Sequence, residues 1–119
     1  MDHFSQQIAL LEQHSTYARR WLAAQPQWVD WLAVQCGKKV DLQGIRELLE
    51  SCHLNSSGQN QDETQFMANL RLARQRLMLW IALRDLSGLA PLGEVTHALS
   101  HFAELAVSAS IAYIRENLR

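Results

Sequence analysis

The residues best placed for chemistry in this sequence are two histidines and a glutamate near its carboxyl end. His97, His101 and Glu104 recur at helical spacing, so one helix would present them on successive turns. Two imidazoles and a carboxylate in this arrangement could hold a metal ion. The HExxH pattern of zinc hydrolases is absent, and Glu104 is not placed as a general base. A solvated helix face is therefore the favoured interpretation.

The other isolated titratable side chains point to structure. His14 and His53 fall near predicted helix ends, where a cationic imidazole interacts favourably with the helix dipole. Cys36 and Cys52 belong to no CxxC motif and no Cys/His ladder. We expect both to be reduced thiols of a cytosolic protein and not a disulfide.

Three arginines, Arg71, Arg74 and Arg76, lie in the middle of the helix predicted at about 62–87, with Arg76 on a different face. Such a cluster could hold a phosphate or an acidic partner surface. The structural alternative, which we favour, is that arginines on a mostly buried helix pair with acids from neighbouring helices. The candidate acids are Glu47, Glu50 and Glu104. Arg84 and Asp85 are predicted to form a polar end to the same helix.

Four tryptophans could stack on nucleic-acid bases, namely Trp21, Trp28, Trp31 and Trp80. A net charge of −1 and a pI near 6.5 give no electrostatic attraction to nucleic acid or to acidic membranes. Their helical spacing favours core packing instead. We therefore expect no nucleic-acid partner.

Length and composition place the chain among ordinary globular proteins. It has 119 residues, of which 48% are hydrophobic and 19% charged, and we expect one domain over residues 1–119. No apolar run approaches the ~20 residues that span a bilayer, and the start MDHFSQQ does not resemble a signal peptide. We expect a cytoplasmic location and no membrane association. The sequence also lacks a Gly-rich phosphate loop, a nucleophile elbow and paired carboxylates for magnesium. We expect no catalytic, cofactor-binding or metal residue in this chain.

The fold predicted to position these residues is all-α, with two long antiparallel helices at about 62–87 and 91–117 and three to four shorter helices. Asp62 is an N-cap with Gln65 expected to reach back to it, and Gly88 ends the first long helix in a left-handed turn. That helix carries two apolar stripes, Phe66, Leu70, Ala73, Leu77 and Ile81, and Leu72, Leu79, Leu83 and Leu86. It should therefore be covered from more than one side and lie at the centre of a bundle.

The shorter helices are bracketed by caps and breakers. One covers residues 3–13, and the next covers 16–24 with Ser15 as its N-cap. Another opens at Pro26 and stops at Gly37, and a fourth covers 42–52 with Asp41 as its cap. Gly44 should weaken the fourth by about 1 kcal/mol relative to alanine. Residues 55–61, NSSGQNQ, form the clearest loop. The last helix has an apolar face of Val95, Leu99, Phe102, Ala106, Ala109 and Tyr113.

Two stretches resemble a known family. In residues 71–106 the matching segments are Arg84-Asp85-Leu86-Ser87-Gly88, Glu94-Val95-Thr96, Leu99-Ser100 and Ala103-Glu104; a second stretch is STYARRWLAAQPQWVDW, residues 15–31. Both resemble the bacterial glutamine synthetase adenylyltransferase, or adenylyl-removing enzyme, family in its amino-terminal helical segment. Residues 38–61 match poorly. The basic run is interrupted by Ala73 and Gln75, while Leu77 and Trp80 replace residues that are commonly an acid and an arginine.

The resemblance implies a regulatory enzyme of nitrogen assimilation. The family transfers AMP from ATP to a tyrosine of glutamine synthetase with magnesium, removes it by phosphorolysis, and responds to the PII regulator. Its two nucleotidyltransferase domains carry the metal ligands, and none of those motifs occurs in these residues. The resemblance implies a non-catalytic fragment that precedes a nucleotidyltransferase domain. The alternative is a free-standing helical module that binds a partner or self-associates through an exposed apolar face.

Overall fold

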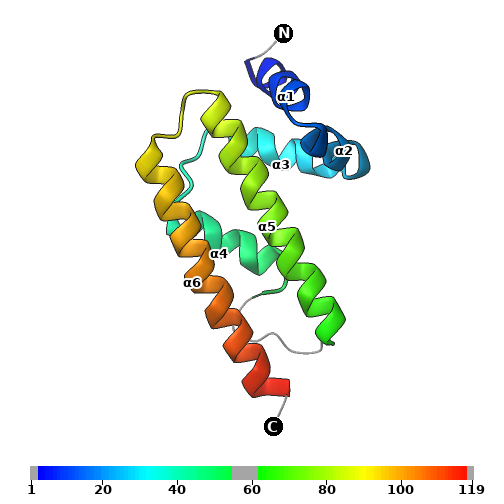
Figure 1. Cartoon of the computed structure of the whole chain (residues 1–119), viewed down its shortest axis with the longest axis vertical. Coiled ribbons are helices and arrows are strands. Elements are labelled where there is room, and N and C mark those ends of the chain that lie inside the picture. Colours follow the sequence, from blue (N-terminus) through cyan, green and yellow to red (C-terminus); the bar gives the residue numbers. More distant parts are fainter. Residues whose placement is uncertain (1–2, 55–61, 118–119) are drawn as a thin grey trace.

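Among the residues that it describes, the structure is an all-α arrangement of six helices, as predicted (Figure 1). It is a computed structural model that describes residues 3–54 and 62–117, in which no strand occurs. The helices are α1 His3–His14, α2 Thr16–Ala24, α3 Gln27–Gln35, α4 Leu42–Ser51, α5 Glu63–Leu86 and α6 Leu92–Asn117. The predicted loop at 55–61 lies outside the described residues.

Side-chain caps fix the starts of three helices. Ser15, Asp41 and Asp62 each accept a hydrogen bond from the backbone N–H three residues further on, at 3.0, 2.8 and 2.7 Å. These bonds satisfy amides that have no partner inside the helix, which confirms the three predicted N-caps. The predicted return of the Gln65 side chain to its cap is wrong. Its amide donates to Asn69 Oδ1 at 3.0 Å instead, because Asn69 lies one turn ahead on the same face.

Helix α5 is the central element, as predicted. It packs against α1, α3 and α4, and its apolar side chains are buried on several sides. Trp80, Leu77 and Leu83 have no exposed surface at all. The apolar stripes lose contact only at the ends of α5, where Leu86 is 37% exposed. A helix with apolar side chains on more than one face needs neighbours on more than one side, and α5 has them.

The connection from α5 to α6 is a left-handed C-cap. Gly88 has φ 72°, and its N–H donates to the Asp85 carbonyl at 3.0 Å. The Leu89 N–H donates to the Arg84 carbonyl at 2.9 Å, which completes the Schellman pattern. Only glycine adopts this φ without a steric cost, so the predicted role of Gly88 is confirmed. Pro91 follows, and α6 runs back antiparallel to α5.

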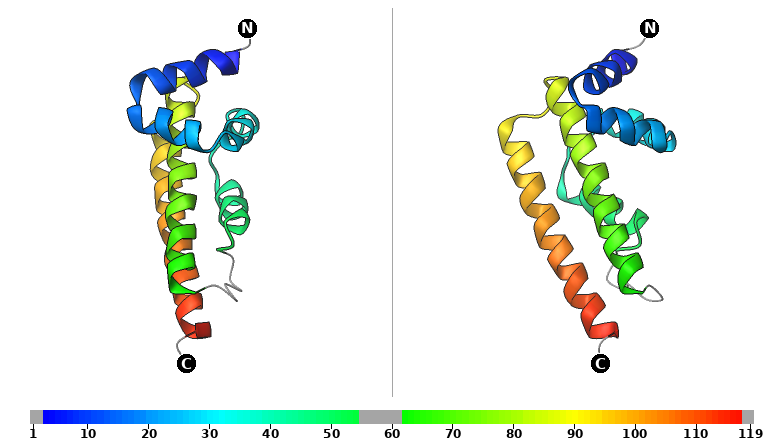
Figure 2. Two further views of the ribbon diagram at one scale, coloured as in Figure 1. Left: turned by 90° about the vertical axis from the view of Figure 1, so that its right-hand side faces the viewer. Right: turned by 45° about the vertical axis from the view of Figure 1, so that its right-hand side comes forward.

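The two long helices run side by side in opposite directions, and α4 packs on one side of the layer that they form (Figures 1 and 2). Helix α6 makes its more extensive contact with α4, not with α5. At the far end the rings of Phe66 and Tyr113 stack at 4.3 Å with an interplanar angle of 15°. The predicted antiparallel direction is therefore correct, but α6 reaches α5 largely through α4 and through contacts at the two ends.

Candidate functional site

A buried ion pair joins the end of α5 to the start of α6. The Arg84 guanidinium donates from Nε to Glu94 Oε2 at 2.7 Å and from Nη2 to Oε1 at 3.0 Å. It also donates to the carbonyls of Cys36 at 2.9 Å and Leu89 at 3.0 Å. Glu94 Oε2 further accepts from the Val40 N–H at 3.4 Å. Both side chains are over nine-tenths buried, with 8% and 2% exposed. The pair is thus saturated by the protein itself.

This pair corrects the prediction that Arg84 is a polar helix end. Arg84 is buried, whereas Asp85 is exposed and is the polar residue at that position. The partners are ten residues apart, so no helical spacing connects them. The available signal was the Gly88 turn, because a tight reversal places an arginine before it close to an acid after it.

A second buried cation, Arg76, lies between two aromatic rings. Its guanidinium carbon is 4.0 Å from the ring centroid of Trp28 and 4.3 Å from that of Trp31. Nη1 donates to Ser51 Oγ at 2.9 Å and contacts Cys52 Sγ at 3.6 Å. Burial lowers the pKa of Arg76, and the neighbouring Cys52 acts in the opposite direction. The predicted pairing of Arg76 with an acid is wrong, since stacking on tryptophan replaces it.

The tryptophans extend this stack in both directions. Trp21 stacks on Trp28 with centroids 5.5 Å apart, and Trp31 meets Trp80 edge to face at 5.9 Å. The Trp80 indole N–H donates to the Gln35 carbonyl at 2.8 Å. Core packing of the tryptophans is confirmed. One aromatic and cationic cluster connects α2, α3 and α5.

Gly44 has a packing role that its helix propensity did not indicate. A Cβ built on this residue would lie 2.7 Å from Cη2 of the Trp80 ring. The indole is fully buried and fixed by its hydrogen bond, so it has little room to move. Glycine fits at this position of α4 because the Cβ of any other residue would clash with the Trp80 ring.

The histidine pair on α6 faces an open pocket. The rings of His97 and His101 are 6.3 Å apart, His97 is exposed and His101 is half-buried. The pocket also includes Asp41, which caps α4, and Glu94, which is bonded to Arg84. Within residues 3–54 and 62–117, no group of three or more His, Cys, Asp or Glu side chains could hold a metal ion. The pair thus has the geometry of a helix surface.

Arg71 and Arg74 are exposed on α5. In the part of the chain that the structure describes, neither forms an ion pair with Glu47, Glu50 or Glu104, so these predicted pairings are wrong. The reason is geometric: α4 contacts the opposite side of α5, where Arg76 lies. The two guanidinium groups remain available to a partner.

The remaining titratable residues lie at helix ends or in the core. His14 is the last residue of α1 and is exposed. His53 follows α4 with φ 61°, in the left-handed region. Cys36 and Cys52 are buried free thiols, as predicted.

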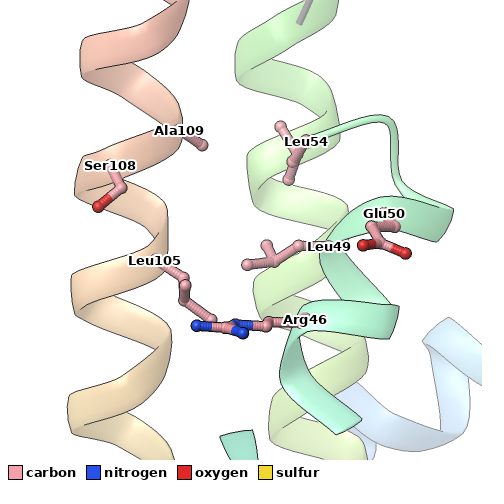
Figure 3. Close-up of a pocket in the computed structure, with 7 residues that line it drawn as sticks. All are labelled: Arg46, Leu49, Glu50, Leu54, Leu105, Ser108 and Ala109. Carbon is pink, nitrogen blue, oxygen red and sulfur yellow. The ribbon is translucent and has the colours of Figure 1, made fainter. Parts of the chain in front are cut away.

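The pocket between α4 and α6 has an apolar floor (Figure 3). It measures about 350 Å³ and is lined by Arg46, Leu49, Glu50, Leu54, Leu105, Ser108 and Ala109. The Arg46 side chain extends across the opening toward α6 (Figure 3). Ser108 on α6 and Glu50 on α4 do not point toward each other (Figure 3), and the lining provides no set of metal ligands. The pocket is a seam between two helices.

Comparison with known proteins connects this architecture to one family. Residues 5–118 match the family described as glutamate-ammonia ligase adenylyltransferase. The chain is similar to the bifunctional glutamine synthetase adenylyltransferase/adenylyl-removing enzyme of Aromatoleum aromaticum, with 31% identity over 87% of the chain and 10% of the relative. It is likewise similar to the protein of that name from Ralstonia nicotianae, with 38% identity over 81% of the chain and 8% of the relative.

The chain spans about a tenth of the length of these curated relatives. No solved structure shows a significant match to it. The match includes Arg84, Glu94 and all four tryptophans. The buried pair and the aromatic cluster described above therefore lie inside the matched region.

Proposed function

The chain belongs to the glutamate-ammonia ligase adenylyltransferase family, and from this we propose that it is a non-catalytic, amino-terminal helical segment of a larger regulatory enzyme. The whole enzyme would transfer AMP from ATP to a tyrosine of glutamine synthetase and remove it by phosphorolysis. This single helical domain would precede a nucleotidyltransferase domain and support it. The proposed location is the cytoplasm.

The observation that carries the proposal is the use made of the Arg84–Glu94 pair. These two residues belong to the motif by which the chain resembles the family, and both are fully engaged inside the protein. They hold the α5–α6 turn, the end of α3 and the last part of the α3–α4 connection in one place. Because both motif residues bind only other parts of the protein, their geometry supports a scaffolding role for these helices.

ATP and magnesium are proposed to act in another part of the polypeptide. The four described glycines outside 55–61 lie singly, at helix ends or, for Gly44, against Trp80. A triphosphate with magnesium needs a run of backbone N–H groups and convergent carboxylates, and the described residues do not fit that requirement. Glutamine synthetase and the PII regulator are proposed partners of the whole enzyme. No helix among the described residues is long and apolar enough to cross a membrane.

Two assays test the proposal. The purified chain, given ATP, magnesium and glutamine synthetase, should transfer no AMP. The Ralstonia nicotianae enzyme carrying this chain in place of its own matching segment should transfer AMP, and Glu94→Gln in that chimera should lower thermal stability and activity together. AMP transfer by the 119-residue chain alone would contradict the proposal.

The alternative, a free-standing self-association module, has one observation in its favour. Large apolar side chains are exposed on α6, with Leu92 exposed by 82%. That reading predicts a chain that dimerises or oligomerises as its concentration rises. Light scattering that reports a monomer throughout would remove it.

A further inference from the structure

One side of the layer formed by α5 and α6 is covered only in part by the helices that the structure describes. In Figure 2 (left) α3 and α4 lie on one side of the α5–α6 layer, and below α1 and α2 no helix among the described residues covers the opposite side. We call this the outer face, made of Met67, Arg71, Arg74 and Met78 on α5 and Leu92 and Leu99 on α6. Met78 and Leu92 line one groove between the two helices, so these two residues lie on the same face of the α5–α6 layer.

The outer face is strongly apolar on α6. Leu92 and Leu99 are 82% and 44% exposed, and the α6 residues that follow on this side are alanine, serine and branched apolar side chains. Glu94, His97 and His101 of α6 instead line a pocket with the α3–α4 connection and the start of α4. Apolar surface of this extent, free of charge, is typical of a surface that is covered in the assembled protein.

The α5 edge of the outer face adds charge and adaptable packing. Arg71 and Arg74 are exposed, nearly one turn apart, and form no ion pair among residues 3–54 and 62–117. Met67 and Met78, exposed by 47% and 39%, flank them. Guanidinium groups bind carboxylates in a bidentate manner, and methionine adapts its shape to a partner. The complementary surface is therefore an apolar stripe edged by at least two carboxylates.

We propose that the outer face binds an apolar, carboxylate-edged surface of the rest of the same polypeptide. This inference rests on the proposed function, because it takes the occupant from the larger enzyme. The curated relatives are about ten times longer than this chain, so each carries a large amount of additional protein that could cover the face. The pairing of Arg71 and Arg74 with carboxylates would set the register of that contact.

Hydroxyl-radical footprinting tests the inference with the Ralstonia nicotianae chimera described above. Oxidation of Met67 and Met78 should be slower in the chimera than in the isolated 119-residue chain, by about fivefold if both enter the dry centre of an interface. Tyr17, 55% exposed on α2, is the internal reference and should be equally reactive in both.

Charge-reversal variants separate this surface from general folding. In the chimera, Arg71→Glu/Arg74→Glu should restore fast methionine oxidation, while lysine at both positions should keep the protection. The matched control is Arg19→Glu/Arg20→Glu, a reversal of two exposed arginines on α2, which should leave the protection intact.

The outcomes distinguish the two proposals. An active chimera with unprotected methionines overturns the outer-face inference and leaves the proposed function standing. A protected but inactive chimera supports the face and counts against the function. If the chimera does not fold while the unmodified Ralstonia nicotianae enzyme does, the outer face and the rest of that enzyme are not complementary. Protection already present in the isolated chain, together with a dimeric mass, assigns the face to a second copy and overturns the inference.

Discussion

Replacing Glu94 with glutamine is predicted to destabilise the chain severely. The change keeps the shape of the side chain and an oxygen for the Val40 N–H, but it removes the negative charge beside Arg84. Because the two side chains are only 2% and 8% exposed, water cannot replace that charge. Breaking a buried pair by removing one partner costs about 3–5 kcal/mol. The total free energy of unfolding of a domain of this size is roughly 6–18 kcal/mol.

Urea unfolding followed by tryptophan fluorescence measures this cost, because Trp80 and its neighbours report on the core. Arg84→Met should cost at least as much, since it also leaves the carbonyls of Cys36 and Leu89 without a donor. The matched control is Glu104→Gln on the exposed surface of α6, expected within about 0.5 kcal/mol of the wild type. A cost below about 1 kcal/mol for Glu94→Gln would refute the reasoning, because it would mean that the pair is solvated.

Three further substitutions test the packing. Gly44→Ala should lower the free energy of unfolding by about 1 kcal/mol despite its gain in helix propensity, since the new Cβ meets Trp80. The control Gly93→Ala, with open space around the Cβ, should stabilise the protein, and a stabilising Gly44→Ala in urea unfolding would contradict the contact. The stability of Arg76→Met should lie within about 1 kcal/mol of that of the wild type, because a thioether also packs between the two flanking rings, while Arg76→Ala should lose about 3 kcal/mol of stability. Equal shifts of the melting temperature for both variants would argue against stacking. The His53→Gly protein should be more stable than the His53→Ala protein by about 1 kcal/mol, because glycine adopts a positive φ without steric strain. Calorimetry that ranks the two variants in reverse would show that this backbone conformation is not strained.

The sequence was sufficient for features that depend on local geometry. Ser15, Asp41 and Asp62 were predicted as caps because a cap bonds to an amide only three residues away. Gly88 was predicted as a left-handed terminus for the same reason. The central position of α5 also followed from its own apolar pattern.

Features that depend on how helices meet could not be derived in this way. The partners of Arg76 and Arg84 come from α3, α4 and α6, so helical spacing within α5 carries no information on them. Acids were the expected partners because most arginines pair with carboxylates, yet Arg76 stacks on indole rings. The packing role of Gly44 was hidden as well, since it depends on the ring of Trp80.

The hydrogen bonds of Arg84 and Glu94 have a consequence for cooperativity. They tie four backbone segments together: the end of α3, the α3–α4 connection, the α5–α6 turn and the first turn of α6. None of these segments can open alone without exposing a charge or an orphaned carbonyl, so fraying at this corner is suppressed. The amide proton of Val40, which in another short connection would exchange with solvent rapidly, should exchange here only when the entire bundle unfolds.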